Sequence, residues 1–253
     1  MMPGTIERAC FLLCLALGWL LRCGRYSSVR IVDDAAGRRV AKHRRFYAPV
    51  VVWIGGQLMW LLDTGVRVLP QRAWQERERR LYWTLYGSAI RIDADGTLLL
   101  PWLAGESLAT LLENRELAGS MRTTAIELAA VALADFHRGG FTHGDAMAEN
   151  VMIDRESGIA RWFDFETIHE SGRTIVWQRA DDVRALLFTC LRRQPPELHA
   201  ATFQLIVEAY GDDEVASALA ASVRPVLRRS LAFHLAQAPL PFAQYRAIAR
   251  LSS

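Results

Sequence analysis

The chain has 253 residues, of which 51% are hydrophobic and 23% charged, a composition typical of a folded globular protein and not of a disordered one. Its formal net charge of +3 is too small to indicate a nucleic-acid-binding protein. The charge is unevenly distributed, because residues 1–97 carry 15 basic and 8 acidic side chains whereas residues 98–253 carry 15 and 19. This asymmetry predicts two lobes with a cleft suited to a polyanion and its metal ions. An arginine-rich face that only aids solubility is the alternative.

An apolar stretch, residues 9–21, lies in the first part of the chain between Arg8 and Arg22. It is shorter than the roughly 20 residues that a membrane-spanning helix needs. No small-x-small cleavage site follows it, so a cleaved signal peptide is disfavoured. We expect residues 1–25 to form an apolar helix that packs on the body or lies at a membrane surface, and a signal anchor is the next alternative.

The four cysteines lie at positions 10, 14, 23 and 190 and form no CxxC pair. Free thiols in a reducing compartment are the plain interpretation. This favours a cytoplasmic protein, with the inner face of the membrane as a further expected location because of the apolar segments.

Two hairpins and one helix are predicted in the front half. Residues 29–43 alternate around an Asp-Asp-Ala-Ala-Gly turn, and the second strand carries Lys42. Residues 48–69 are apolar and are interrupted by a glycine pair. The spacing of apolar residues predicts a helix over 71–87 that stops at a glycine. Residues 89–103 form a second hairpin with an Asp-Ala-Asp-Gly turn.

The rear half is mainly helical. The clearest helix covers 124–140, a short hairpin over 151–166 interrupts the helical pattern, and about three helices are expected from residue 195 onward. The chain is therefore predicted to be α+β, with a small strand-rich N-lobe over residues 26–103 and a mainly helical C-lobe over residues 104–253.

The chemistry is concentrated in "HGDAMAENVMIDRESGIARWFDFE", residues 143–166. Asp145 precedes Asn150 by five residues, and Asp164 ends the second short strand. Oxygen ligands on opposite arms of a tight hairpin can converge on one Mg²⁺. Asp145 lies on the loop before the hairpin, where it can accept a proton from an attacking hydroxyl. A metal, a base and a cation on the phosphates are the main requirements of phosphoryl transfer.

With this order of residues, the chain resembles the protein-kinase-like superfamily over about residues 30–190. His143-Gly144-Asp145 is similar to its catalytic-loop triplet, and Asp164-Phe165-Glu166 is similar to its DFG triplet. The resemblance implies a two-lobed protein-kinase-like fold with ATP and Mg²⁺ as cofactors. Asp145 would be the base, and Asn150 and Asp164 would hold the metal.

The resemblance also implies a nucleotide site. Lys42 in "VAK" looks like the strand lysine, and Glu78 is similar to the helix glutamate that pairs with it. Backbone groups of three consecutive residues would meet adenine at the hinge: Pro101, Trp102 and Leu103. Lys42 is the only lysine beside 29 arginines. A compact ammonium suits a phosphate site where the planar guanidinium does not, and chance placement is the alternative.

Supporting roles are implied for neighbouring residues. His143 would brace the loop by hydrogen bonding, and Asp182 would support the loop from below, with Asp181 as the competing choice. His137 is expected to be structural. His169 has only Glu170 beside it and is expected to form no metal site.

The chain departs from protein kinases at several points. No GxGxxG precedes Lys42, Met147 replaces a phosphate-steadying lysine, and Glu166 replaces the glycine of DFG. No APE-like motif occurs in the short segment before Asp182, so we expect no phosphorylation-switched activation loop. These features resemble the compact bacterial branch: RIO-type atypical kinases, lipopolysaccharide sugar kinases, and aminoglycoside or choline phosphotransferases.

The implied activity is ATP- and Mg²⁺-dependent transfer of phosphate to a hydroxyl of a protein Ser/Thr or of a lipid-linked sugar. A small-molecule phosphotransferase is one alternative, and a weak or inactive pseudokinase acting as a nucleotide-sensing adaptor is another. The expected partner is the hydroxyl-bearing acceptor and not nucleic acid.

The apolar segment 49–62 has two interpretations. It is an insert packed on the N-lobe, or it contacts a membrane together with 9–21, where Arg44, Arg45 and Arg67 would suit anionic headgroups.

Overall fold

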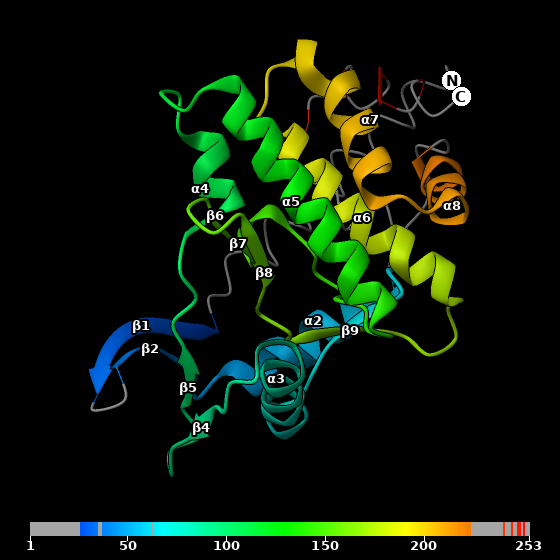
Figure 1. Ribbon diagram of the computed structural model, residues 1–253. Coiled ribbons are helices and arrows are strands. Elements are labelled where there is room, and N and C mark those ends of the chain that lie inside the picture. The colour runs from blue at the N-terminus through cyan, green and yellow to red at the C-terminus, as the bar shows by residue number, and fades with distance from the viewer. Residues whose placement is uncertain are drawn as a thin grey trace.

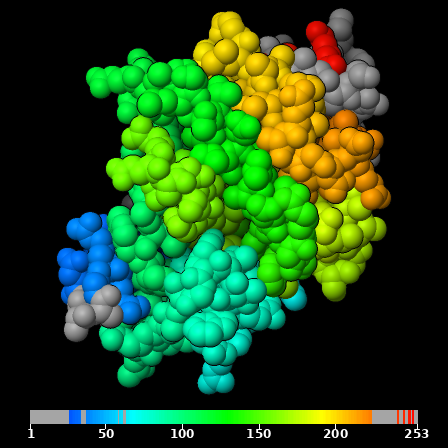
Figure 2. Space-filling model, viewed as in Figure 1, coloured from blue at the N-terminus to red at the C-terminus, as the bar shows by residue number. Residues whose placement is uncertain are grey.

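The structure is a computed structural model that describes residues 26–34, 37–61, 63–223, 240, 244, 247, 248 and 250. The expected apolar helix over 1–25 and most of the tail beyond residue 223 lie outside these residues. The fold is α+β and two-lobed, as predicted: a strand-rich N-lobe lies below a mainly helical C-lobe (Figures 1 and 2).

The N-lobe sheet contains four antiparallel strands in the order β1-β2-β5-β4. Both predicted hairpins are present. The strands are β1 (Ser27–Asp34), β2 (Gly37–Arg44), β4 (Arg91–Ile92) and β5 (Leu98–Pro101). Lys42 lies in the middle of this sheet, opposite Val29 on β1 and Leu98 on β5. Its side chain is buried although it carries a charge.

Two helices and a short strand separate β2 from β4. The apolar segment forms α2 (Ala48–Leu61), which runs through the glycine pair without a break. The strand β3 (Val66–Val68) follows, and then α3 (Gln71–Tyr86). The C-cap of α3 is Gly87 with φ +60°, the left-handed conformation that glycine adopts at low cost, as the sequence predicted.

The C-lobe is built around α6, in which every residue from Ala180 to Leu191 is buried. Helices α4, α5, α7 and α8 surround it (Figure 1). The C-lobe helices are α4 (Leu108–Glu113), α5 (Gly119–Arg138), α6 (Ile175–Leu191), α7 (His199–Tyr210) and α8 (Asp213–Val223). The short 3-10 helix Pro196–Leu198 precedes α7.

A three-stranded sheet lies where the lobes meet, in the order β6-β7-β8. Its strands are β6 (Glu106–Ser107), β7 (Val151–Asp154) and β8 (Ile159–Trp162), and the 3-10 helix Ala148–Asn150 precedes β7. Gly105 enters this sheet with φ +105°, and a Cβ there would lie 2.2 Å from the carbonyl oxygen of Ile153. Only glycine fits this crossing between lobes.

A second contact joins the lobes. The strand β9 (Thr167–His169) begins directly after the Asp164-Phe165-Glu166 triplet and pairs antiparallel with β3 from the N-lobe. The Leu69 N–H also donates to the Glu166 carbonyl at 2.8 Å. The segment after the triplet is therefore fixed in a sheet.

Among the residues described, none of the helices has both the length and the apolar character required to cross a bilayer.

Candidate active site

A cleft of about 530 Å³ opens between the N-lobe sheet and the C-lobe, and both Lys42 and Asp164 line it. The three predicted hinge residues, Pro101, Trp102 and Leu103, also line it. Its remaining walls are mostly apolar and include Val29, Ile31, Val40, Leu100, Met152 and Phe163. An apolar cleft with a few polar and charged groups is typical of a binding site for a small molecule.

Lys42 forms ion pairs with two carboxylates of the triplet segment. Its Nζ bonds Asp164 Oδ1 and lies 3.5 Å from Glu166 Oε2. Burial by itself would lower the pKa of Lys42, but the carboxylates of Asp164 and Glu166, with that of Glu78, outweigh it and raise the pKa above its ordinary value. The Lys42 amine is therefore charged at neutral pH despite its burial.

Lys42 does not form the predicted ion pair with Glu78. Within the described residues Lys42 lies within 4.0 Å of Asp164 and Glu166 but not of Glu78. Glu78 is fully buried and accepts instead from the Trp74 indole and from the Phe165 backbone N–H, both at 3.1 Å. It therefore fixes the backbone of the triplet. The carboxylate of Glu166, the third residue of the triplet, lies beside the lysine instead.

The side chain of Glu166 is held from three sides. Tyr26 donates its hydroxyl hydrogen at 2.9 Å, and the Arg44 guanidinium lies 3.4 Å from Oε2. The guanidinium of Arg44 also stacks on the buried Trp74 ring at 4.4 Å and donates to the Leu69 carbonyl at 2.7 Å. Sequence reasoning gave Arg44 a surface role, whereas the structure buries it.

The environment of Glu78 shifts its titration. Burial raises the pKa of Glu78 to about 7, although the nearby Lys42 charge opposes this shift. One carboxylate oxygen, Oε2, is buried and has no hydrogen-bond partner among the described residues. The Glu78 carboxyl therefore keeps its proton to a higher pH than an exposed glutamate does.

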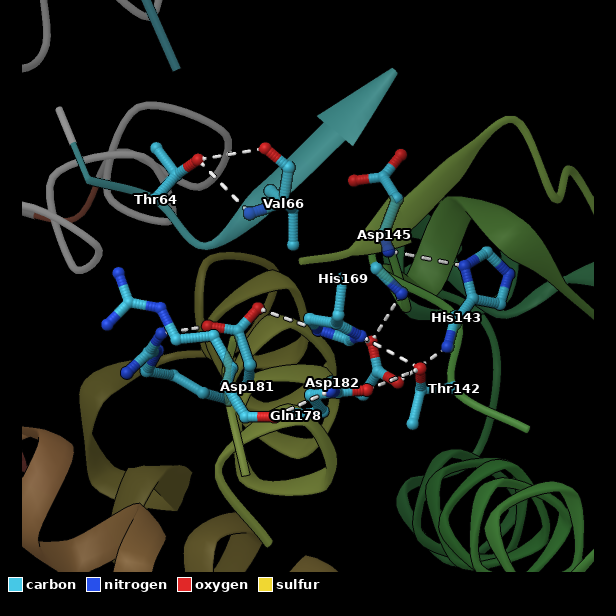
Figure 3. A network of polar contacts seen from close by, with 12 residues as sticks. Thr64, Val66, Thr142, His143, Asp145, His169, Gln178, Asp181 and Asp182 are labelled. Carbon is cyan, nitrogen blue, oxygen red and sulfur yellow. Dashed lines mark hydrogen bonds and ion pairs between the residues drawn. The ribbon is translucent and has the colours of Figure 1, made fainter. Parts of the chain in front are cut away.

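The predicted catalytic loop is fixed from below by Asp182. Its carboxylate accepts the backbone N–H of His143 at 2.7 Å and that of Gly144 at 2.8 Å. Figure 3 shows Asp182 between His169 and this loop, while the Asp145 carboxylate points away from the cluster. His137 Nε2 lies 3.0 Å from Asp182 as well. Asp182 is therefore the supporting aspartate, and the competing choice, Asp181, is wrong for this role.

Asp145, Asn150 and His143 form one hydrogen-bonded unit. The Asn150 amide donates to the Asp145 carbonyl at 2.8 Å and to its Oδ2 at 3.1 Å. His143 Nε2 lies 3.0 Å from the Phe163 carbonyl, and its Nδ1 accepts the Asp145 N–H at 3.3 Å. Burial lowers the pKa of His143 to about 4, so its ring is neutral at neutral pH. This agrees with bracing and not with proton transfer.

Phe163 links the loop residues His143 and Asn150 to Asp164, which follows it in the chain. Its N–H donates to the Asn150 carbonyl at 2.9 Å, and its carbonyl accepts from His143. Asp164, the next residue, has φ +68°, a conformation that is uncommon outside glycine and is often found at functional sites. The loop residues Asp145 and Asn150 do not line the apolar cleft itself.

Sequence reasoning missed a buried cluster around His169. Its ring contacts Thr142 at 3.0 Å and Asp181 at 3.4 Å, and Asp181 pairs with the buried Arg184. Burial alone would lower the pKa of His169, but Asp182 and Asp181 raise it. In the sequence only Glu170 stands beside His169, and no local pattern predicts that β3–β9 pairing brings this ring to α6.

The donor set of the triplet and the loop fits Mg²⁺. Asp164 offers a carboxylate and Asn150 an amide oxygen, the oxygen types that this ion prefers. Within the described residues no cluster of three or more His, Cys, Asp or Glu side chains could cage a metal.

No family model and no curated protein matches the chain. Among solved structures, the chain is similar to one described as Rad53 1–466 in complex with AMP-PNP, with 12% identity and a TM-score of 0.38. The similarity covers 91% of this chain and 57% of the other, so this chain spans little more than half of that protein's length.

Proposed function

We propose that the chain is an ATP- and Mg²⁺-dependent phosphotransferase that moves the γ-phosphate to a hydroxyl group. The observation that carries this proposal is that Lys42 and Asp164 meet in the wall of an apolar cleft that residues 101–103 also line. Such a cleft has room for a purine near the hinge and places its phosphates near the only lysine. Fold alone would not select a function, so the proposal rests on these groups.

Each residue then has a defined task. Lys42 holds the phosphates, and Asp164 with Asn150 would hold Mg²⁺, which neutralises charge on the phosphate oxygens. The acceptor oxygen bonds to the γ-phosphorus while the bond between that phosphorus and the β–γ bridging oxygen breaks, releasing ADP. The proton of the hydroxyl passes to the Asp145 carboxylate, which Asn150 orients through its 3.1 Å hydrogen bond.

We place the chain in the compact bacterial branch of the superfamily. The support is Glu166 at the third position of the triplet, Met147 in place of a phosphate-steadying lysine, and the lack of an APE-like motif before Asp182. For the acceptor we favour a protein Ser/Thr or a lipid-linked sugar, and an aminoglycoside- or choline-type small molecule is the alternative.

The test is ADP formation from ATP in the presence of Mg²⁺, with water as the acceptor, by the full chain and by Asp145→Asn. We expect Asp145→Asn to lose about 10²–10⁴-fold in turnover, the usual contribution of a positioned base. It should keep the ATP–Mg²⁺-dependent rise in melting temperature, because it removes no nucleotide contact. Asp135→Asn, at an exposed position on α5, is the matched control and should leave turnover unchanged. Equal turnover by Asp145→Asn and the parent chain would show the mechanism to be wrong.

One observation favours the second candidate, a weak or inactive pseudokinase that acts as an adaptor. Three carboxylates, Glu78, Asp164 and Glu166, act on Lys42, and so much negative charge opposes a triphosphate. The adaptor predicts no ADP formation and no rise in melting temperature with ATP–Mg²⁺. ADP formation that depends on Asp145 excludes it.

A further inference from the structure

Helix α2 has one face in the protein and one face in solvent, and the solvent face is apolar except for one exposed polar residue, Gln57. Met59 packs on Val66 of β3 and is buried, as is Ala48 on the same side of the helix. The opposite side presents Val50, Ile54 and two tryptophans, Trp53 at 67% and Trp60 at 72% exposure. Their spacing of three, four and seven residues places them in one stripe along the helix.

A groove with positive charge adjoins this stripe. It has a volume of about 630 Å³ and runs between the start of α2 and the start of α3. Trp53 lines it together with Phe46, which is 94% exposed, and with the exposed arginines Arg45 and Arg72. Apolar and cationic groups therefore share one surface.

The two arginines have no acidic partner in the described part of the chain. Arg45 donates to the Tyr47 hydroxyl at 3.2 Å, and neither it nor Arg72 forms an ion pair there. The acidic residue of the groove, Asp95, already accepts from the Thr97 N–H and hydroxyl, both at 2.9 Å. The positive charge is available to a ligand from outside.

These features fit an anionic bilayer surface better than another protein surface. Indole rings beside guanidinium groups are typical of the layer where headgroups meet acyl chains. The helix has 14 residues, which gives a length of about 21 Å. It is too short to span the roughly 30 Å core of a bilayer and long enough to lie in its surface.

We propose that α2 is a membrane-docking helix. The stripe of Val50, Trp53, Ile54 and Trp60 enters the outer acyl region, and the groove with Arg45 and Arg72 receives the phosphate of an anionic lipid. This inference does not depend on phosphotransferase activity, and its test uses no nucleotide.

The first test measures tryptophan quenching of the full chain by vesicles of brominated phosphatidylglycerol and phosphatidylcholine in equal parts. Trp53→Phe/Trp60→Phe keeps the face apolar but removes its two reporters. Trp83→Phe, at an exposed position of α3, is the matched control. We expect the parent chain and the control to be quenched alike and the double variant to lose much of the quenching. Trp19, in the apolar stretch 9–21, is common to all three proteins, so it cannot produce the difference. Equal quenching of all three would overturn the proposal.

The second test measures affinity for the same lipids without bromine. Arg45→Gln and Arg72→Gln should each weaken binding about fivefold, the usual effect of one basic residue at an anionic surface. Neither should change binding to phosphatidylcholine alone, and Arg115→Gln, an exposed arginine between α4 and α5, should have no effect. The competing occupant of the exposed α2 face is a second copy of the chain. Sedimentation without lipid measures whether the chain forms such a dimer. A dimer that Trp53→Ser/Trp60→Ser dissociates, together with unchanged vesicle binding by that variant, would refute membrane docking.

Discussion

Replacing Glu166 with glutamine tests whether Lys42 is oriented by Glu166, as the structure shows, or by Glu78, as the sequence predicted. If Glu166 orients Lys42, Glu166→Gln should impair nucleotide binding while Glu78→Gln has little effect. The reason is that Glu78 acts on the Phe165 backbone and on Trp74, and a glutamine oxygen can still accept both hydrogen bonds. A glutamine at position 166 keeps its shape but loses the charge that faces two cations.

The magnitude follows from the contacts. Glu166 Oε2 lies 3.5 Å from Lys42 Nζ and 3.4 Å from Arg44 Nη2, and its side chain is 15% exposed. Because solvent screens a side chain that is partly exposed, each ion pair of Glu166 contributes about 1 kcal/mol to the free energy that holds Lys42 and Arg44 in place. The two pairs together contribute about 2 kcal/mol. This corresponds to about a 30-fold change in an equilibrium constant. We expect the KM for ATP to rise about 10- to 30-fold in Glu166→Gln and less than about threefold in Glu78→Gln.

The assay is ADP formation at varied ATP, supported by the thermal shift that ATP–Mg²⁺ produces in each variant. Glu166→Asp serves as the control, because it keeps the charge and should recover part of the lost affinity. If Glu166→Gln binds ATP as tightly as the parent chain or more tightly, Glu166 repels phosphate more than it orients Lys42, and the reasoning fails. The same holds if Glu78→Gln shows the larger loss.

Three further outcomes are expected, each measured by urea denaturation. The pKa of Glu78 is raised to about 7 in the folded chain. The folded state therefore binds more protons at Glu78 than the unfolded state does. The contribution of Glu78 to the free energy of unfolding is lost as the pH rises from the ordinary pKa of a glutamate to the raised one. Glu78→Gln should remove this effect, so its stability relative to the parent should increase between about pH 5 and about pH 8, and a constant difference would contradict the assignment. Gly105→Ala should lower the free energy of unfolding by more than about 3 kcal/mol, because its Cβ would meet the Ile153 carbonyl. The control is Gly158→Ala, at φ +68° with open space around it, which should lower it by about 1 kcal/mol. Similar losses in both variants would show that the crossing at Gly105 is not tight. Asp182→Asn should lose about 3–5 kcal/mol, since an amide cannot accept both loop N–H groups, and a loss below about 1 kcal/mol would refute this support.

The site was predictable where residues lie close together in sequence. The spacing of Asp145, Asn150 and Asp164 places them around one hairpin, and the structure places them there. Lys42 was singled out because it is the only lysine in the chain and lies in "VAK" on a predicted strand. Glu166 could not, because an acidic residue after Phe165 has no local pattern that reveals which cation it will face.

Other features depend on pairing between distant segments. The strands β3 and β9 have three residues each, too few for an alternation to be recognised. Their pairing decides the surroundings of His169, which the sequence left without partners. In the same way, a continuous apolar run such as 49–62 does not show which of its faces will be covered. The structure answers this for Met59 on the inside and Trp53 on the outside.

The pairing of β3 with β9 has a kinetic consequence. Together with the Lys42–Asp164 pair and the Tyr26–Glu166 hydrogen bond, it fastens the N-lobe to the C-lobe on one side of the cleft. Any motion that widens the cleft must stretch this side or pivot about it. For the phosphotransferase proposed above, we expect release of ADP to be slower than phosphate transfer.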